Sequence, residues 1–330
     1  MDALVETLAA PASDLLAEDD VLPTLRQWHR EGVRTALVTL VGIEGGSPRP
    51  LGAQMAVAED GRYVGYLSGG CMEQAVALEA RGVIAARENR LVRYGRGSRY
   101  FDIQLPCGSG IDLYFDCGID GAQLDEIEAH RASRRSFVLR TDLATGASSV
   151  ETWNVSDGSA CCRNGEVFAR VYYPRPRLLL LGSGPTVSAL ASLAAATGLD
   201  TEVWSPDEVT RVKVGDAGLT CAGGSRLSED AIARIDFATG VVLVFHDHDI
   251  EPPLLAQLLR RDCFYIGALG SRTVHRQRLE ALTELGCSGE ELARLRAPIG
   301  LIQGAKSKAT LAVGILAQLM AEAKARNLVA

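Results

Sequence analysis

Residues 177–190 read RLLLLGSGPTVSAL, and this stretch specifies the architecture of the second half of the chain. Its apolar run at 178–181 is typical of a strand buried on both faces of a parallel sheet. Gly182 and Gly184 permit a tight turn after that strand, and the apolar segment beyond them predicts a helix at 186–197. The pattern therefore predicts the strand, glycine turn and helix that open a doubly wound, Rossmann-like domain.

Buried strands and helices alternate after this unit, as in a parallel α/β sheet. The expected strands are Thr201–Trp204, Val241–Phe245 and Cys263–Ile266, and the expected helices are Pro252–Arg261, Arg272–Leu285 and Lys308–Lys324. Before Pro174-Arg175-Pro176 the chain has short β-like runs broken by glycines, with an apolar-periodic helix at 72–87. We therefore expect an α/β protein with an N-terminal α+β domain at 1–173, including a hairpin segment at 137–173, and a Rossmann-like domain at 174–330.

The composition is that of an ordinary globular protein. Of 330 residues, 47% are hydrophobic and 23% are charged, which excludes a disordered chain. No apolar run approaches the roughly 20 residues that a membrane helix requires, and the acidic stretch at 1–20 lacks the basic segment of a signal peptide. A net charge of -7 argues against a nucleic-acid-binding surface. We therefore expect a cytoplasmic protein with neither a membrane nor nucleic acid as a partner.

Two turns of the second half are candidates for phosphate binding, because each precedes a helix whose N-terminus offers free N–H groups. The first turn and helix start comprise Gly182, Ser183, Gly184, Pro185 and Thr186, and the second comprises Gly267, Gly270, Ser271 and Arg272. The acidic residue expected to bind a ribose is displaced to Asp207. The alternative is structural, with glycines that serve only the turns and Ser271 as a helix N-cap.

Two cysteines lie in glycine-rich loops of the first half. Cys71 follows Ser68-Gly69-Gly70 and is expected in the first turn of a helix, where the dipole stabilises a thiolate. Cys107 lies between Pro106 and Gly108. Both are candidates for contact with a soft ligand, and the alternative is that each simply fills a buried corner. Three other cysteines fall in hydrophilic stretches and suggest no role: Cys161, Cys162 and Cys287.

Polar residues of two further loops are candidates for ligand contact. Ser47 and Arg49 present a hydroxyl and a guanidinium to an anion, although Arg49 fits a solvated turn equally well. His246, Asp247 and His248 follow a buried strand at the edge where α/β domains bind ligands. They fit hydrogen bonding to a ligand better than metal ligation because no third histidine follows, and no CxxC pair occurs among the eight cysteines. No metal site is therefore expected.

Taken together, these pieces resemble the XdhC/CoxI family of accessory factors for xanthine dehydrogenase and related molybdenum hydroxylases. The resemblance spans nearly the whole chain in the family order. Its motifs are GGSPRPLGAQM (45–55), GYLSGGCMEQAV (65–76), PCGSGIDLYFD (106–116), RLLLLGSGPTVSAL (177–190), FHDHD (245–249), FYIGALGSR (264–272) and APIGL (297–301). The chain departs from the family pattern at Pro185-Thr186, where His-Val is common, and at Ile302-Gln303.

The resemblance implies a two-domain, homodimeric chaperone without metabolite turnover. Such a protein would bind molybdenum cofactor as cargo, support its sulfuration by a cysteine desulfurase and deliver it to a molybdenum hydroxylase client. Two other functions stay open. An NAD(P)-dependent oxidoreductase on the same scaffold would bind substrate between the two domains and use Cys71, Cys107, His246 or His248 as candidate catalytic groups. A non-catalytic partner protein would have a vestigial pocket.

Overall fold

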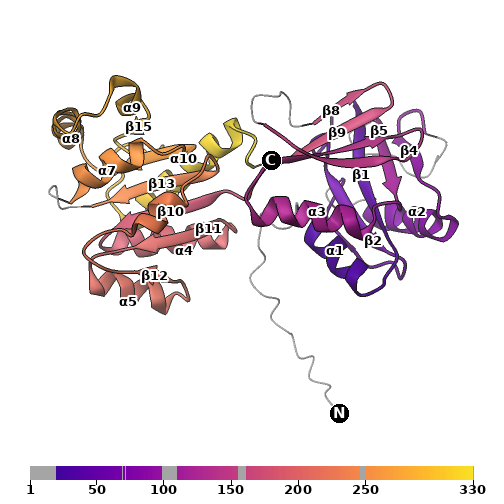
Figure 1. Cartoon of the computed structure of the whole chain (residues 1–330), viewed down its shortest axis with the longest axis horizontal. Helices are drawn as coiled ribbons and strands as arrows, with labels where there is room; N and C mark the ends of the chain where they lie inside the picture. The colour runs from indigo at the N-terminus through magenta and orange to yellow at the C-terminus, as the bar shows by residue number, and fades with distance from the viewer. Residues whose placement is uncertain are drawn as a thin grey trace, which may run out of the picture. The chain divides into compact units, whose positions relative to one another are not determined.

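The computed structural model describes residues 20–68, 70, 72–98, 110–154, 161–245 and 250–329. The chain divides into two compact units that meet in sequence between Pro174 and Arg175. The described residues form two sheets in the N-terminal unit and one in the C-terminal unit, and the units are taken in turn (Figure 1). Within the described residues no helix combines the length and the apolar character needed to cross a bilayer.

The N-terminal unit is built on a five-stranded antiparallel sheet in the order β3-β2-β1-β5-β4. Its strands are β1 (Thr35–Glu44), β2 (Gln54–Ala58), β3 (Tyr63–Val64), β4 (Arg90–Gly95) and β5 (Gly110–Asp116). The central strand β1 pairs with β2 on one side and with β5 on the other. The four longer strands confirm the expected pattern of short β-strands in the first half.

Helices cover both faces of this sheet because apolar residues of β1 point in both directions. Val38 and Leu40 pack on the face covered by α2 (Glu73–Ala86). Leu37 lies on the opposite face, against α1 (Leu22–Arg30) and α3 (Gly121–Ala132). The largely buried strand β1 is thus the centre of a layered α+β unit.

A second antiparallel sheet, in the order β7-β6-β9-β8, completes the N-terminal unit. Its strands are β6 (Phe137–Asp142), β7 (Ser148–Thr152), β8 (Cys161–Asn164) and β9 (Val167–Tyr172). Phe137 and Tyr172 stack with ring centroids 4.7 Å apart in the core shared with α1 and α3. The hairpins predicted between 137 and 173 are therefore present, and they close one face of the first sheet.

The C-terminal unit holds a six-stranded parallel sheet in the order β12-β11-β10-β13-β14-β15. Its strands are β10 (Arg177–Gly182), β11 (Asp200–Trp204), β12 (Cys221–Ala222), β13 (Thr239–Val244), β14 (Tyr265–Ala268) and β15 (Leu295–Arg296). Numbered from β10, this is the 3-2-1-4-5-6 order of the doubly wound fold, and the strand order reverses between β10 and β13. The predicted Rossmann-like topology is confirmed.

Helices lie on both faces of the parallel sheet. Gly240 pairs with Leu178 and faces Leu319 of α10 (Lys308–Ala325), which packs beside α4 (Pro185–Ala196). Leu179 and Leu181 point the other way. The opposite core contains residues of α7 (Glu251–Leu259) and α8 (Arg272–Glu284). Three described helices of this unit were not predicted from sequence: α5 (Glu208–Asp216), α6 (Glu229–Ala233) and α9 (Gly289–Ala293).

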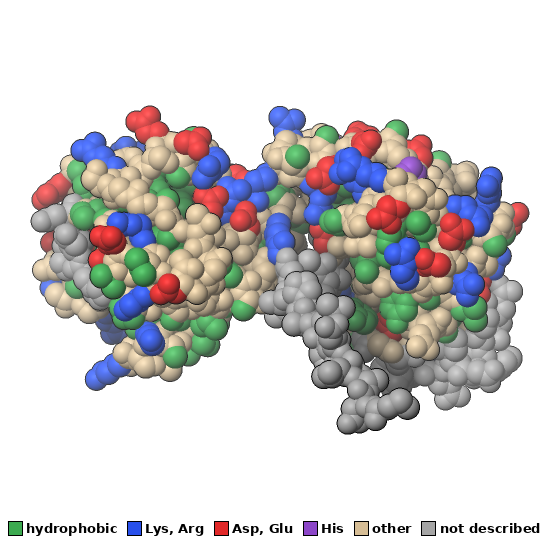
Figure 2. Space-filling view, turned by 90° about the horizontal axis from the view of Figure 1, so that it is seen from below, with side chains coloured by type: hydrophobic (Ala, Val, Ile, Leu, Met, Phe, Trp, Pro, Cys, Tyr) green, Lys and Arg blue, Asp and Glu red, His purple; other side chains and the backbone are tan. Residues whose placement is uncertain are grey.

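Charged side chains of both signs are interspersed on the face shown in Figure 2. Many of the arginines form ion pairs at the surface, such as Arg34 with Glu59 and Arg26 with Asp125. The described part of this face carries no extended basic surface of the kind that tracks a nucleic acid backbone. Local sites, rather than a broad charged face, are therefore the candidates for ligand binding.

Candidate functional site

Three of the sequence motifs lead to the same edge of the five-stranded sheet. Glu44, Gly95 and Gly110 lie level with one another, so β1 and β4 end and β5 begins at this edge. Gly65 follows β3 and lies against the backbone of Gln54, where β2 begins. The segments 45–53, 65–72 and 96–109 therefore start or end here, and we call this the motif edge.

The buried Glu73 carboxylate organises the loop that carries the second motif. Its Oε1 accepts hydrogen bonds from the N–H groups of Leu67 at 3.0 Å and Ser68 at 2.8 Å. Its Oε2 accepts one from the Met72 N–H at 3.1 Å, and the Ser68 hydroxyl bonds to both oxygens. The side chain is only 1% exposed. One carboxylate thus holds both ends of the loop from Leu67 to Met72.

Glu73 stays ionised in this setting. Burial by itself would raise the pKa of Glu73, but the hydrogen bonds from Ser68 and Leu67 together hold that pKa below its usual range. The carboxylate also lies in the first turn of α2, where the helix dipole favours a negative charge. The available signal was an acidic residue that opens a helix after a glycine-rich loop, and no role for it was predicted from the sequence.

Three side chains from the two sheets form a chain of hydrogen bonds where the first-motif loop joins β2. The Tyr172 hydroxyl donates to Gln54 Oε1 at 2.8 Å, and Gln54 Nε2 donates to Thr39 Oγ1 at 3.1 Å. A Cβ added at Gly52 would overlap the Cys161 Sγ, so this glycine, with φ +84°, is required by close packing. The expectation that Cys161 is incidental was wrong, because β8 places its thiol under this loop.

Burial raises the pKa of Cys161, although the charge of Arg170 opposes the shift. The thiol is therefore protonated near neutral pH. Cys287 was also misjudged from its hydrophilic surroundings, since it lies in the core of the C-terminal unit and is 7% exposed. Its helix-end position buries the side chain while the flanking residues stay polar.

Ser47 and Arg49 lie in the loop between β1 and β2 at the motif edge. The Arg49 N–H donates to Ser47 Oγ at 3.3 Å, which closes a local turn. Arg93 of β4 ties the neighbouring strands together, because its guanidinium pairs with Glu44 and with Asp112, the latter at 3.2 Å. The same side chain donates to the Arg96 carbonyl at 2.8 Å, at the start of the segment 96–109 that leads into the third motif. The base of the motif edge is therefore rigid on the side of β4.

The glycine turn after β10 lies at the carboxyl edge of the parallel sheet, where the strand order reverses. A Cβ on Gly182 would overlap the Val244 carbonyl oxygen, and Gly182 has φ +150°. Ser183 N–H donates to that same carbonyl at 3.0 Å. The first glycine is thus required by the close approach of β13, which the sequence did not predict, and the Ser183 N–H binds the turn to that strand.

A chain of hydrogen bonds connects this turn with α5. The Gly184 N–H donates to Thr210 Oγ1 at 2.8 Å, and the Thr210 hydroxyl donates to Asp207 Oδ2 at 2.5 Å. Asp207 is the N-cap of α5 and also accepts from the Thr210 N–H. These bonds lower the pKa of Asp207. The carboxylate considered as a ribose ligand is therefore engaged within the protein.

The N–H groups of this turn are largely committed. Ser183 and Gly184 donate within the chain, and Pro185 at the first position of α4 has no N–H. A dinucleotide site needs several such groups facing the pyrophosphate. Thr186 is left as the first N–H of the predicted set that can face a ligand, so this turn is poorly equipped for NAD(P).

The second predicted turn divides into packing and capping residues. Gly267 lies inside β14 rather than in the loop, and a Cβ there would overlap Tyr265 and Ile299. Gly270 has φ +152° and lies close to Val274 and Arg278. Ser271 is the N-cap of α8 and accepts from the Val274 N–H at 3.2 Å. The structural alternative for Ser271 is therefore present, while Arg272 opens α8 as an exposed residue.

A buried ion pair underlies this second turn. Arg278 Nη2 lies 3.1 Å from Glu251 Oε2, and both side chains are 2% exposed. The same nitrogen donates to the Leu269 carbonyl at 2.7 Å. Glu251 opens α7 directly after the loop that follows β13. The pair therefore joins the loops after β13 and β14, a connection that no local sequence signal indicated.

Six candidates lie outside the described residues: Gly69, Cys71, Cys107, His246, Asp247 and His248. Helix α2 begins at Glu73 with Met72 as its N-cap, close to the predicted start at 72. Gly70 is described, with φ +110° and open space around its Cα. The described residues that flank Cys71 and Cys107 lie at the motif edge, and those that flank residues 246–248 follow β13.

Sequence comparison identifies two family models that match the chain. Residues 28–95 match the XdhC and CoxI family, and residues 178–319 match the XdhC Rossmann domain. The molybdenum cofactor insertion chaperone PaoD of Escherichia coli (strain K12) is 38% identical over 288 residues, which cover 87% of this chain and 83% of PaoD. A probable xanthine dehydrogenase subunit of Bacillus subtilis (strain 168) is 25% identical, covering 91% of this chain and 96% of that protein.

Structural comparison gives the same architecture. A crystal structure described as a xanthine dehydrogenase from Bacillus halodurans aligns with a TM-score of 0.73. The alignment covers 94% of this chain and 96% of that chain at 23% sequence identity. At this identity the likeness extends to the fold alone, so both units of the chain have a counterpart in a solved structure.

Proposed function

The chain belongs to the XdhC and CoxI family, and we accordingly propose that it binds molybdenum cofactor and inserts it into a molybdenum hydroxylase of the xanthine dehydrogenase type. The observation that carries the proposal is the 38% identity to the E. coli insertion chaperone PaoD over most of both chains. The function is that of a chaperone, so the cofactor is cargo that the protein holds and releases.

The geometry supports this role at the motif edge. A carboxylate-clamped loop precedes α2, and the flanks of the Cys107 segment lie at the same edge. Thiols suit the molybdenum end of the cofactor because a thiolate, like the cofactor's own dithiolene, is a soft sulfur ligand for the metal. We propose that Cys71 and Cys107 contact this end of the cofactor, with Ser47, Arg49, Ser68 and the glycines at 69 and 70 around it.

The carboxyl edge of the parallel sheet is suited to a phosphate group. The helix starts at Thr186 and Arg272 offer N–H groups to a phosphate, and Arg272 adds an exposed positive charge. We propose that these residues, together with the loop at His246, Asp247 and His248, bind a phosphate group.

The partners follow from the chemistry of the cargo. A molybdenum hydroxylase client receives the cofactor, and a cysteine desulfurase supplies sulfur before the transfer. We propose that the chain works in the cytoplasm as a homodimer. The described cysteines are all free thiols, which is typical of a reducing compartment. Size-exclusion chromatography with light scattering tests the dimer, and a monomeric mass would remove that part of the proposal.

An NAD(P)-dependent oxidoreductase on this scaffold is not favoured. The turn after β10 commits two of its N–H groups internally and has a proline at the next position. Asp207 caps α5 instead of standing free for a ribose. A titration with NADPH that saturates at micromolar concentration and quenches the emission of the buried Trp204 would restore this alternative.

The proposal is tested by identifying the bound ligand. The protein is purified anaerobically from a host that makes molybdenum cofactor, and molybdenum, pterin and nucleotide are measured on one sample by elemental and mass analysis. We expect molybdopterin near one equivalent per chain. Bound NAD(P) without pterin would contradict the proposal. So would failure of the loaded protein to activate an apo-hydroxylase.

The thiol roles are tested by Cys71→Ala and Cys107→Ala. Each is expected to lower cofactor retention at least about tenfold if one charge-assisted or metal contact is lost, without loss of the folded state. Cys162→Ala is the matched control, because Cys162 is an exposed thiol on β8. Retention equal to that of the control in both variants would remove the thiols from the site.

A further inference from the structure

A large pocket lies at the end of the five-stranded sheet opposite the motif edge. It encloses about 900 Å³ and is lined by residues that begin β1, end α2 and follow β5. Arg34 and Thr35 line it, whereas the motif edge lies where β1 ends at Glu44. We call it the distal pocket, and no part of the proposed cofactor site uses it.

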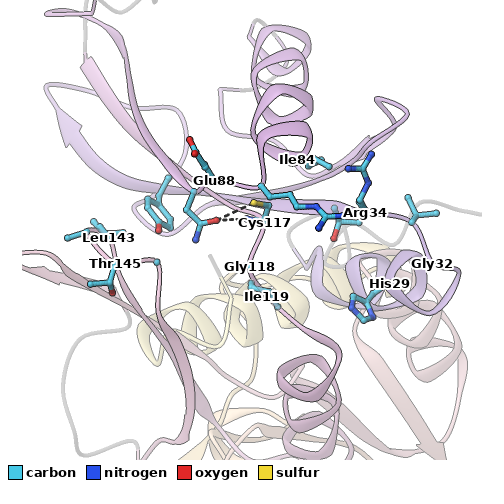
Figure 3. Close-up of a pocket in the computed structure, with 17 residues that line it drawn as sticks. His29, Gly32, Arg34, Ile84, Glu88, Cys117, Gly118, Ile119, Leu143 and Thr145 are labelled. Atoms are coloured by element: carbon cyan, nitrogen blue, oxygen red, sulfur yellow. Dashed lines mark hydrogen bonds between the residues drawn. The ribbon is translucent and has the colours of Figure 1, made fainter.

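The floor of the distal pocket is polar, and most of its polar groups hydrogen-bond to one another. Asn89 Oδ1 accepts from the Cys117 N–H at 2.9 Å and contacts the Cys117 thiol at 3.4 Å. Asn89 Nδ2 donates to Asp116 Oδ1 at 3.1 Å. Burial raises the pKa of Cys117, so the thiol is protonated and unreactive at neutral pH. Figure 3 shows Cys117 between Glu88 and Arg34.

Tyr114 is the exception on this floor. The residue is 3% exposed, and its hydroxyl makes no hydrogen bond of standard geometry within the described residues, although the Asn89 side chain lies beside it. Burial raises the pKa of Tyr114, although the Asn89 side chain beside it opposes the shift, so the hydroxyl keeps its proton and is a donor. A buried hydroxyl without a partner is unfavourable, and such groups are rare in native proteins. Because Tyr114 lines the pocket, a ligand that carries an acceptor atom would satisfy it.

Apolar and charged side chains share the lining of the pocket. Ile84, Val33, Ile119 and Leu143 line the pocket, with Leu143 across from His29 in Figure 3. Arg34 is neutralised by Glu59 at 2.6 Å. Arg87, in contrast, makes no side-chain hydrogen bond or ion pair within the described residues.

Arg87 has an unusual backbone conformation for an arginine. It caps α2 with φ +57° and ψ +37°, in the left-handed region where glycine or asparagine is favoured. Asparagine tolerates the left-handed region better than arginine, but the chain has arginine at position 87 and asparagine only at position 89. This costly conformation places the arginine side chain in the lining of the pocket.

We propose that the distal pocket binds a small organic anion, with its apolar body against Ile84 and Leu143, its charged group at Arg87 and an acceptor atom at the Tyr114 hydroxyl. The pocket volume is that of a site for a ligand of drug-like size. Of the charged lining residues, Arg34 is paired with Glu59 and Glu88 carries one negative charge, so Arg87 is the positive charge that can face the ligand's anionic group.

The test uses anilinonaphthalene sulfonate, a fluorescent anion with an apolar body, titrated into the full-length protein. We expect saturable binding that Arg87→Gly weakens about tenfold and Tyr114→Phe weakens about fivefold, from the loss of one charged contact and one hydrogen bond respectively. Arg87→Gly should at the same time raise the Tm by about 3 °C, because it relieves a left-handed residue.

Two matched variants separate the site from general surface binding. Arg134→Gly relieves a second left-handed arginine, at φ +51° and outside the pocket, and Tyr63→Phe removes the hydroxyl of an exposed tyrosine on β3. Both should keep wild-type affinity. Equal affinity in all four variants would overturn the proposal.

Discussion

Glu73 Oε1 accepts a hydrogen bond from the Ser68 N–H at 2.8 Å, across the four residues that separate them in sequence, Gly69 to Met72. The Ser68 hydroxyl bonds to the same carboxylate, and its oxygen accepts from the Met72 N–H at 3.2 Å. Both residues are buried in the part of the chain that the structure describes. These contacts fix Ser68 and Met72, on either side of Cys71 in sequence, at the motif edge.

Glu73→Gln should destabilise the N-terminal unit by about 2–3 kcal/mol at pH 7. The hydrogen bonds to a charged group become weaker, and the glutamine NH2 group donates where a carboxylate oxygen accepted. Guanidinium unfolding followed by circular dichroism measures the change. The matched control is Glu79→Gln, since Glu79 lies on the same helix and forms a surface pair with Arg90. That control should cost less than about 1 kcal/mol.

The effect of Glu73 should depend on pH with a defined sign. Its pKa is lowered in the folded protein, so its stabilisation is complete above the unfolded pKa of 4.5 and is lost as the pH falls through the folded pKa. The difference in unfolding free energy between wild type and Glu73→Gln should therefore shrink from pH 6 to pH 3. A difference that grows on acidification would contradict the assignment.

The two glycines of the turn after β10 should differ in their tolerance of alanine. Gly182→Ala places a Cβ about where the Val244 carbonyl stands and should cost at least about 3 kcal/mol. Gly184→Ala meets no atom within 4 Å and should cost only about 1 kcal/mol, from its φ of +92°. Thermal denaturation of both variants measures this, and equal losses would contradict the close approach of β13.

Thr210→Val keeps the shape of a buried side chain but removes the hydroxyl that joins Gly184 to Asp207. We expect a loss of about 1–3 kcal/mol, because the Gly184 N–H and the Asp207 carboxylate both lose a partner. Thr210→Ser should restore most of it. Urea unfolding with hydrogen exchange at Gly184 provides the readout, and unchanged protection in the valine variant would show that this bond is dispensable.

The Glu251–Arg278 pair should behave as a coupled unit in the C-terminal unit. Either Glu251→Gln or Arg278→Met should cost about 3–5 kcal/mol, because each leaves a buried charge without its counter-charge. The double variant should cost less than the sum of the two. A double-mutant cycle in urea measures the coupling, and additive losses would indicate that the two charges do not interact.

Most of the elements that position the site were predicted from the sequence. Every strand of four or more residues in the C-terminal sheet was expected, since apolar runs such as 178–181 have no other stable location. Four described helices were not predicted: α3, with 12 residues, and the shorter α5, α6 and α9. Helices α6 and α9 bury no residue. Single motifs were misleading where packing dominates, as with Gly267, which lies inside β14, and Cys161, which packs under the first motif.

The two-part fold and the family could thus be inferred from the chain alone, because hydrophobic periodicity, glycine turns and ordered motifs are local properties of a sequence. Which polar groups are engaged depended instead on tertiary packing. Asp207 became a helix cap, Glu73 a loop clamp, and Arg278 the partner of Glu251, 27 positions away in sequence. These roles depend on distances between elements that are remote along the chain, and no local pattern encodes such distances.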